Sequence, residues 1–166
     1  MKKKPTIVSQ VSNTTFLKFK LKEERFVVNT ENISDILEIP SIIKLPGSPE
    51  YLRGIIIFSK VAVPVVDLRL IMKYPRVGIS VNSNIILFRS FLDHKINYIG
   101  ALVDSIEEIV ELELDQVPNG KSKVEKLVSE SQDSKYNFLN PQYLISPEDF
   151  LLINNLILKA ALNTNR

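Results

Sequence analysis

The chain has 166 residues, a length that suits one domain or two small subdomains sharing a core. Its 21 Lys and Arg against 19 Asp and Glu give a net charge of +2, without the clustered basic excess typical of nucleic-acid and membrane binding. The absence of cysteine excludes disulfides and cysteine-ligated zinc, and it fits a reducing compartment.

Residues 1–13 are expected to form a flexible N-terminus. We expect no export signal there, because polar residues stand where a signal peptide would need an apolar core. From Thr15 to Leu21, apolar and lysine side chains then alternate with a period of two, which predicts a strand. The charged residues 22–25 predict a turn, and residues 26–28 predict a returning strand. A short helix capped by Asn29 or Thr30 is expected next, because apolar residues follow at helical spacing: Ile33, Ile36 and Leu37.

Residues 45–69, LPGSPEYLRGIIIFSKVAVPVVDLR, predict a turn, two strands and the start of a helix. Gly54 opens the first apolar run, and Ser59 and Lys60 turn the chain into a second, β-branched run. Pro64 cannot donate a ladder hydrogen bond, so the second strand is expected to be an edge strand, bulged or bent. Asp67 suits the N-cap of a helix beginning DLRLIMK.

The second half predicts further strands. A polar loop over 76–84 precedes the apolar run 85–88, which is expected to be an interior strand. His94 and Lys95 are placed in a turn, residues 97–103 in a strand, and 107–114 in a half-buried strand. Residues 118–135 are expected to form a mobile loop without fold-critical residues. Together these elements indicate a mainly β domain of closed or nearly closed sheets.

Ser146, Pro147, Glu148 and Asp149 are typical of a helix start. The apolar stretch that follows is interrupted by asparagines and is shorter than the roughly 18 residues that span a bilayer. We therefore expect a soluble, cytoplasmic protein.

Candidate catalytic and ligand-binding residues are few. His94 is the only histidine, so we interpret it as a solvated turn residue rather than as a metal ligand or triad member. Asp67 and Asp104 suggest a paired-carboxylate acid/base site, but each also suits a backbone cap, which we favour. The Leu45–Pro49 turn lacks the Lys-Ser/Thr of a phosphate loop. No cofactor, metal or enzymatic activity is predicted.

Two lysine groups suggest a nucleic-acid surface, but acidic residues interleave in the second group and no aromatic cluster accompanies it. We interpret both groups as solvated and predict no nucleic-acid partner. Their members are Lys2, Lys3 and Lys4, and Lys121, Lys123 and Lys126.

The order of several segments resembles the CheW family of bacterial chemotaxis adaptors. These segments are the Leu-Pro-Gly-x-Pro turn, an aromatic residue and a glycine, Pro-Val-Val-Asp-Leu-Arg, and Ile-Gly-x-Leu-Val-Asp-x-Ile over residues 99–106. The resemblance covers roughly residues 14–151, which we assign to a CheW-like domain, followed by a C-terminal helix and tail over 152–166. It implies two small five-stranded β-barrel subdomains around a shared core, with short helices and a C-terminal helix.

The resemblance also implies a function. The chain would be a non-catalytic adaptor that links the cytoplasmic tip of a chemoreceptor to the regulatory domain of the histidine kinase CheA. The alternative is a divergent CheW-like scaffold in another bacterial signalling or motility complex. Neither requires insertion into a membrane.

The binding residues implied by the resemblance line a receptor groove and a neighbouring turn. The groove would contain Ile33, Asp35, Arg53, Gly54, Gly100 and Ile106. Core packing is the alternative for the two isoleucines, and a glycine-only backbone conformation is the alternative for Gly54. At the turn the chain departs from the family, because Ser59 and Lys60 replace the usual Arg-Gly and Ile57 replaces an Asn.

Overall fold

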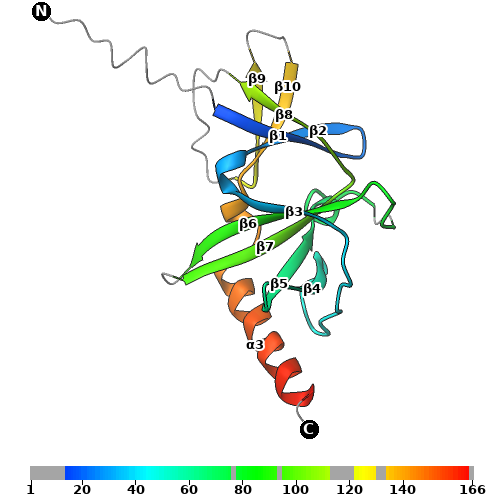
Figure 1. Cartoon of the computed structure of the whole chain (residues 1–166), viewed down its shortest axis with the longest axis vertical. Coiled ribbons are helices and arrows are strands. Elements are labelled where there is room, and N and C mark those ends of the chain that lie inside the picture. Colours follow the sequence, from blue (N-terminus) through cyan, green and yellow to red (C-terminus); the bar gives the residue numbers. More distant parts are fainter. Residues whose placement is uncertain (1–13, 76–77, 93–94, 113–121, 130–133, 165–166) are drawn as a thin grey trace, which may run out of the picture.

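The structure is a computed structural model that describes residues 14–164 except 76–77, 93–94, 113–121 and 130–133. Ten strands form two five-stranded sheets that lie one above the other (Figure 1). Sheet A contains β1 (Thr14–Leu21), β2 (Glu24–Asn29), β8 (Ser105–Leu112), β9 (Val124–Ser129) and β10 (Ser134–Leu139). Sheet B contains β3 (Ile33–Glu38), β4 (Leu52–Phe58), β5 (Val61–Asp67), β6 (Asn84–Leu92) and β7 (Lys95–Val103). The predicted mainly β architecture is confirmed.

Among the described residues, the α-helices are α2 (Leu68–Ile71) and α3 (Pro147–Thr164), and the short 3-10 helices are η1 (Thr30–Asn32) and η2 (Pro141–Tyr143). As predicted, Asp67 caps α2 by accepting from the Arg69 N–H at 3.0 Å. Ser146 likewise caps α3, accepting from the Asp149 N–H at 3.1 Å. No helix among the described residues is both long and apolar enough to cross a bilayer.

The strand orders are β8-β1-β2-β10-β9 in sheet A and β3-β6-β7-β5-β4 in sheet B. Most neighbours run antiparallel, but β10 pairs in parallel with β2, and β5 with β7. Both parallel pairs join strands from different halves of the chain. Each sheet is therefore complete only when distant segments of the chain pair.

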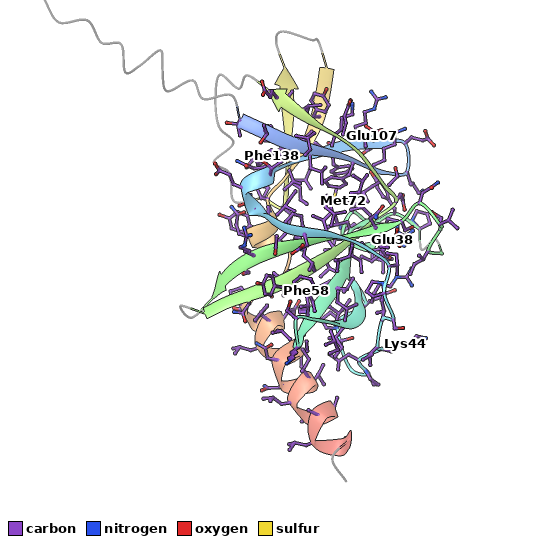
Figure 2. All side chains as sticks on the ribbon, in the orientation of Figure 1. Glu38, Lys44, Phe58, Met72, Glu107 and Phe138 are labelled. Carbon is purple, nitrogen blue, oxygen red and sulfur yellow. The ribbon has the colours of Figure 1, made fainter. Side chains whose placement is uncertain are left out.

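Strands that are apolar on both faces build three hydrophobic cores. In β6, Ile85 and Leu87 point into sheet B's own interior, whereas Ile86 and Phe88 point into a core shared by both sheets. Sheet A has its own interior around Phe138, and Phe58 packs at the interior of sheet B (Figure 2). The period-two pattern thus explains how each strand serves two cores.

The shared core lies between the two sheets, where Met72 packs against it (Figure 2). Sheet A contributes Phe19 and Phe26, whose rings stack with centroids 5.5 Å apart. Helix α3 contributes Phe150 and Ile153. The helix therefore packs as part of the same unit as the sheets, across the boundary expected at residue 152.

The helix predicted over 33–37 is wrong. Asn29 does act as a cap, accepting from the Glu31 N–H at 2.8 Å, but the helix ends after the single 3-10 turn η1. Ile33 and Asp35 lie instead in β3, with a register shift between them. A bulge adds one residue to the alternation, so apolar residues in β3 imitate helical spacing.

The expectation for Pro64 is also corrected. The strand β5 lies between β4 and β7, so it is an interior strand, and the edge strand on this side of sheet B is β4. The parallel ladder to β7 begins only at Val65, which leaves Pro64 just before it. The irregularity lies in the partner strand, between Leu52 and Gly54.

The loop predicted over 118–135 is wrong at residues 124–129, which form β9, and at 134–135, where β10 begins. Val124 packs against the shared core, and the Asn140 N–H donates to the Lys123 carbonyl at 2.8 Å. The polar composition suggested a loop, but edge strands also carry charged residues, which oppose aggregation. The predictions for residues 1–13, His94, Glu113 and Leu114 lie outside the described residues.

Candidate functional site

The Asp-Leu-Arg after β5 forms a buried charged cluster. Asp67 is fully buried and Arg69 is 1% exposed. The Arg69 guanidinium donates twice to the Asp67 carboxylate, from Nε at 3.0 Å and from Nη2 at 2.9 Å. This bidentate geometry is the strongest that a carboxylate and an arginine form. The Asp67 carboxylate holds the pKa of Arg69 above its ordinary value.

Two more charged residues complete the cluster. Arg53 of β4 donates from Nε to Asp67 Oδ2 at 3.0 Å. Arg69 Nη1 reaches Asp104 Oδ1, between β7 and β8, at 3.1 Å. The second Asp104 oxygen accepts from the Lys22 N–H at 2.6 Å, in the β1–β2 turn of sheet A. We call Arg53, Asp67, Arg69 and Asp104 the charge hub, which connects the two sheets.

The charge hub explains the two aspartates for which an acid/base site was the alternative interpretation. Both carboxylates accept from Arg69, so neither is positioned as a proton donor towards an open site. Among the described residues, no group of three His, Cys, Asp or Glu side chains is arranged as metal ligands. The pairing also satisfies the rule that charges are buried only with partners.

Gly54 has a clear structural role. Its φ of +145° is a conformation that L-residues avoid, and a Cβ there would lie 2.2 Å from the Ile43 carbonyl oxygen. That carbonyl accepts from the Ile55 N–H at 2.8 Å, and the Ile43 N–H donates to the Ile55 carbonyl at 2.8 Å. The missing side chain therefore lets residue 43 pair with β4 and cover the open side of sheet B.

Gly100 is likewise explained by packing. It lies buried in β7, paired with Val65, and an added Cβ would meet Ile85 at 3.0 Å and Val65 at 3.2 Å. Ile33 and Ile106 are half-buried and pack against the shared core. Binding by these three residues stays a prediction, beside the packing roles that the structure gives them.

The remaining predicted residues are more open to solvent. Asp35 is exposed on β3, where its carboxylate accepts from the Ser34 hydroxyl at 2.9 Å. Arg53 lines a hollow of about 520 Å³ with the Leu45–Ser48 turn and Gly78. Ser59 and Lys60 are exposed at the end of the β4–β5 hairpin. The eight residues thus come from both edge strands of sheet B, its interior, the β4–β5 turn and β8.

The hairpin end has an unusual backbone. Ser59 has φ +47° and Lys60 φ +65°, both in the left-handed region. Two consecutive positive φ values are the signature of a type I′ hairpin turn, which favours Asn and Gly. The departure from the family at these residues therefore places ordinary side chains in a backbone that glycine adopts more readily.

An apolar patch that we did not predict from the sequence lies beside this turn. Ile43 is 51% exposed and Ile57 is 61% exposed. Because Ile43 pairs with Ile55, Ile43 and Ile57 lie diagonally on one face of the edge strand β4. We call these two residues the edge patch. The signal in the sequence was the continuous apolar run 55–58, which contains more apolar residues than a strand with one buried face requires.

The comparisons with known proteins agree with this geometry. The family model described as a CheW-like domain matches residues 15–132. The chain belongs to the CheW-like domain family. It is 24% identical over 102 residues to the chemotaxis protein CheW of Klebsiella aerogenes, covering 61% of this chain and 59% of that protein. The chain thus matches under two thirds of that CheW relative's length.

The fold is similar to that of a solved CheW protein. The crystal structure of the scaffolding protein TtCheW from Thermoanaerobacter tengcongensis aligns with a TM-score of 0.64 and 21% sequence identity. The alignment covers 78% of this chain and 90% of that one. The CheW-like architecture predicted from the motifs is therefore confirmed.

Proposed function

We propose that this chain is a cytoplasmic, non-catalytic coupling adaptor, which binds a chemoreceptor tip and the regulatory domain of the kinase CheA. Membership of the CheW-like family supports a scaffold role. The single observation that carries the proposal is the edge patch beside the exposed β4–β5 turn. Two exposed isoleucines on one face of an edge strand provide an apolar surface on which a partner protein can pack.

The charge hub also supports an adaptor role, because its charged groups are occupied with one another. Its carboxylates and guanidinium groups bind one another across the sheets, leaving recognition to the surface. The exposed charges of Asp35 and Lys60 would then set charge complementarity with the partner, beside the neutral hydroxyl of Ser59. Rim charges of this kind affect association rate and partner choice more than they affect affinity.

The experiment is a calorimetric titration of the chain against the CheA regulatory domain from the same cell and, separately, against a receptor-tip fragment. Ile57→Asp should raise the Kd for at least one of the two partners at least about tenfold, because it removes an apolar anchor. Ile109→Asp is the matched control, since Ile109 is also an isoleucine and is 65% exposed, but lies on β8. Equal Kd values for wild type and Ile57→Asp with both partners would contradict the proposal.

The second candidate is a CheW-like scaffold of another signalling or motility complex. The observation that favours it is the altered turn, where Ser59 and Lys60 replace the Arg-Gly that the family usually carries. Loss of a guanidinium removes a planar, bidentate donor. If the native chain binds neither chemotaxis partner while Ser59→Arg restores binding to CheA, this second candidate is favoured.

A further inference from the structure

Helix α3 carries leucines on the side that faces away from the protein. Leu151, Leu158 and Leu162 are 63%, 62% and 68% exposed, whereas Phe150 and Ile153 are buried in the shared core. At about 100° per residue, the three leucines align on one stripe roughly opposite the buried face. In Figure 1, α3 runs along sheet B and its last turns project past the β4–β5 hairpin.

The spacing of this stripe is that of a coiled coil. With Leu151 at a d position, Asn155 falls at a, Leu158 at d and Leu162 at the next a. Ala161 and Asn154 take the flanking g positions, and Lys159 takes an e position. In a parallel pair, like charges meet only at the first turn of the helix, where the exposed Glu148 takes the a position before Leu151. We call Leu151, Asn155, Leu158 and Leu162 the α3 seam.

Asn155 identifies the partner. A lone Asn at an a position hydrogen-bonds best to an identical Asn at the same level of a parallel partner helix. Against an antiparallel helix, or against an unrelated apolar groove, its amide would be buried against leucine without a hydrogen bond, which is unfavourable. The α3 seam is therefore self-complementary.

We propose that the α3 seam is a homodimer interface, in which two copies of this chain pair their C-terminal helices in parallel and in register. Each body packs on the far side of its own helix, so the two bodies do not obstruct the pairing. The helix is already ordered by Phe150 and Ile153, which reduces the entropic cost of association.

The area indicates a weak dimer. Together with Leu152, which is 42% exposed, the stripe offers about 400 Å² of leucine surface per copy, or about 800 Å² for the pair. Specific stable interfaces bury roughly 1,200–2,000 Å². Dimerisation should therefore depend on protein concentration, and it would present two edge patches to partners at once, raising avidity.

Disulfide trapping tests the register directly, because the chain contains no cysteine. In a parallel, in-register pair, the two Cα atoms at position 155 face each other. Their separation should fall within the roughly 4.4–6.8 Å that a disulfide requires, so the thiols of Asn155→Cys can join. Under mild oxidation, Asn155→Cys should form covalent dimer at least about tenfold faster than Ile109→Cys, at another exposed site on β8. Equal rates would overturn the proposal.

Sedimentation velocity over a concentration series provides the second arm. The wild-type sedimentation coefficient should rise with concentration, and Leu158→Lys should abolish that rise while Ile109→Lys leaves it unchanged. Because Leu158 and Ile109 are both exposed, neither substitution disturbs a core, and thermal melting of both variants confirms folding. A wild-type protein that stays monomeric at every concentration would overturn the proposal. A dimer that persists in the Leu158→Lys variant would overturn it as well.

Discussion

The two ends of the β4–β5 hairpin differ in what holds them. At the base, Arg53 and Arg69 both donate to the buried Asp67 carboxylate over 2.9–3.0 Å, so each charge depends on the others. At the tip, Ser59 and Lys60 are exposed in a left-handed backbone. The fold therefore explains the base residues, whereas it does not require the side chains at the tip. Residues of one motif can thus serve stability and recognition separately.

The largest effect on stability is expected from a substitution at the base of the hairpin. Asp67→Ala leaves the Arg69 guanidinium buried without its bidentate partner and should lower the free energy of unfolding by about 3–5 kcal/mol. Urea denaturation measures it. The double variant Asp67→Ala/Arg69→Met should recover at least about 1 kcal/mol, because no unpaired charge then remains at position 69. If the double variant were less stable than Asp67→Ala, the charge hub would not be the cause.

A smaller effect of opposite sign is expected at the tip. Lys60→Gly relieves a left-handed conformation and should raise the free energy of unfolding by about 1 kcal/mol. The control is Lys44→Gly, an exposed lysine outside that backbone region, where glycine should only destabilise. Should both glycine variants lower stability in the same urea titration, the tip would not be strained.

The smallest effect concerns pH, near the base. The Tyr74 hydroxyl, just after α2, donates to Glu24 of β2 at 2.6 Å. Burial, together with this hydrogen bond, raises the pKa of Tyr74 to about 12 from its ordinary 10.0. Because the folded pKa is the higher one, its contribution to stability is complete below pH 10 and disappears as the pH rises through about 12.

The measurement is the free energy of unfolding of wild type and Tyr74→Phe between pH 9 and about 12. The wild type should lose stability more steeply towards the upper end of that range, and the two curves should be parallel near pH 9. Identical slopes at high pH would show that Tyr74 does not couple the region after α2 to sheet A.

The sequence predicted correctly those elements whose hydrophobic pattern matches the way they pack in the fold. Alternation in β1 and the runs of β4, β5, β6 and β7 predicted strands correctly, because each face meets a core. It failed at Ile33 because the β3 bulge adds a residue to the alternation, which periodicity cannot distinguish from a helical turn. It failed at β9 because polar composition resembles a loop when only one ladder is made.

The candidate site was less predictable for a physical reason. Asp67 was recognised as a helix cap, but its guanidinium partners come from β4 and from two residues ahead, and only the folded chain brings Asp104 to them. The edge patch depends on Ile43 pairing with Ile55 across a loop. The α3 seam was readable as leucine spacing, yet which leucines face outward follows only from where the helix docks.

The strand order of sheet A has a consequence for synthesis of the protein. The β1–β2 hairpin is made first, but its neighbours β8 and β10 are the eighth and tenth strands along the chain. During translation, sheet B has all of its strands once residue 103 has emerged, while both edges of the β1–β2 hairpin still lack partners. Unpaired edges and long loop closures slow folding and invite aggregation. The nascent chain is therefore most vulnerable between the emergence of β7 and that of β10.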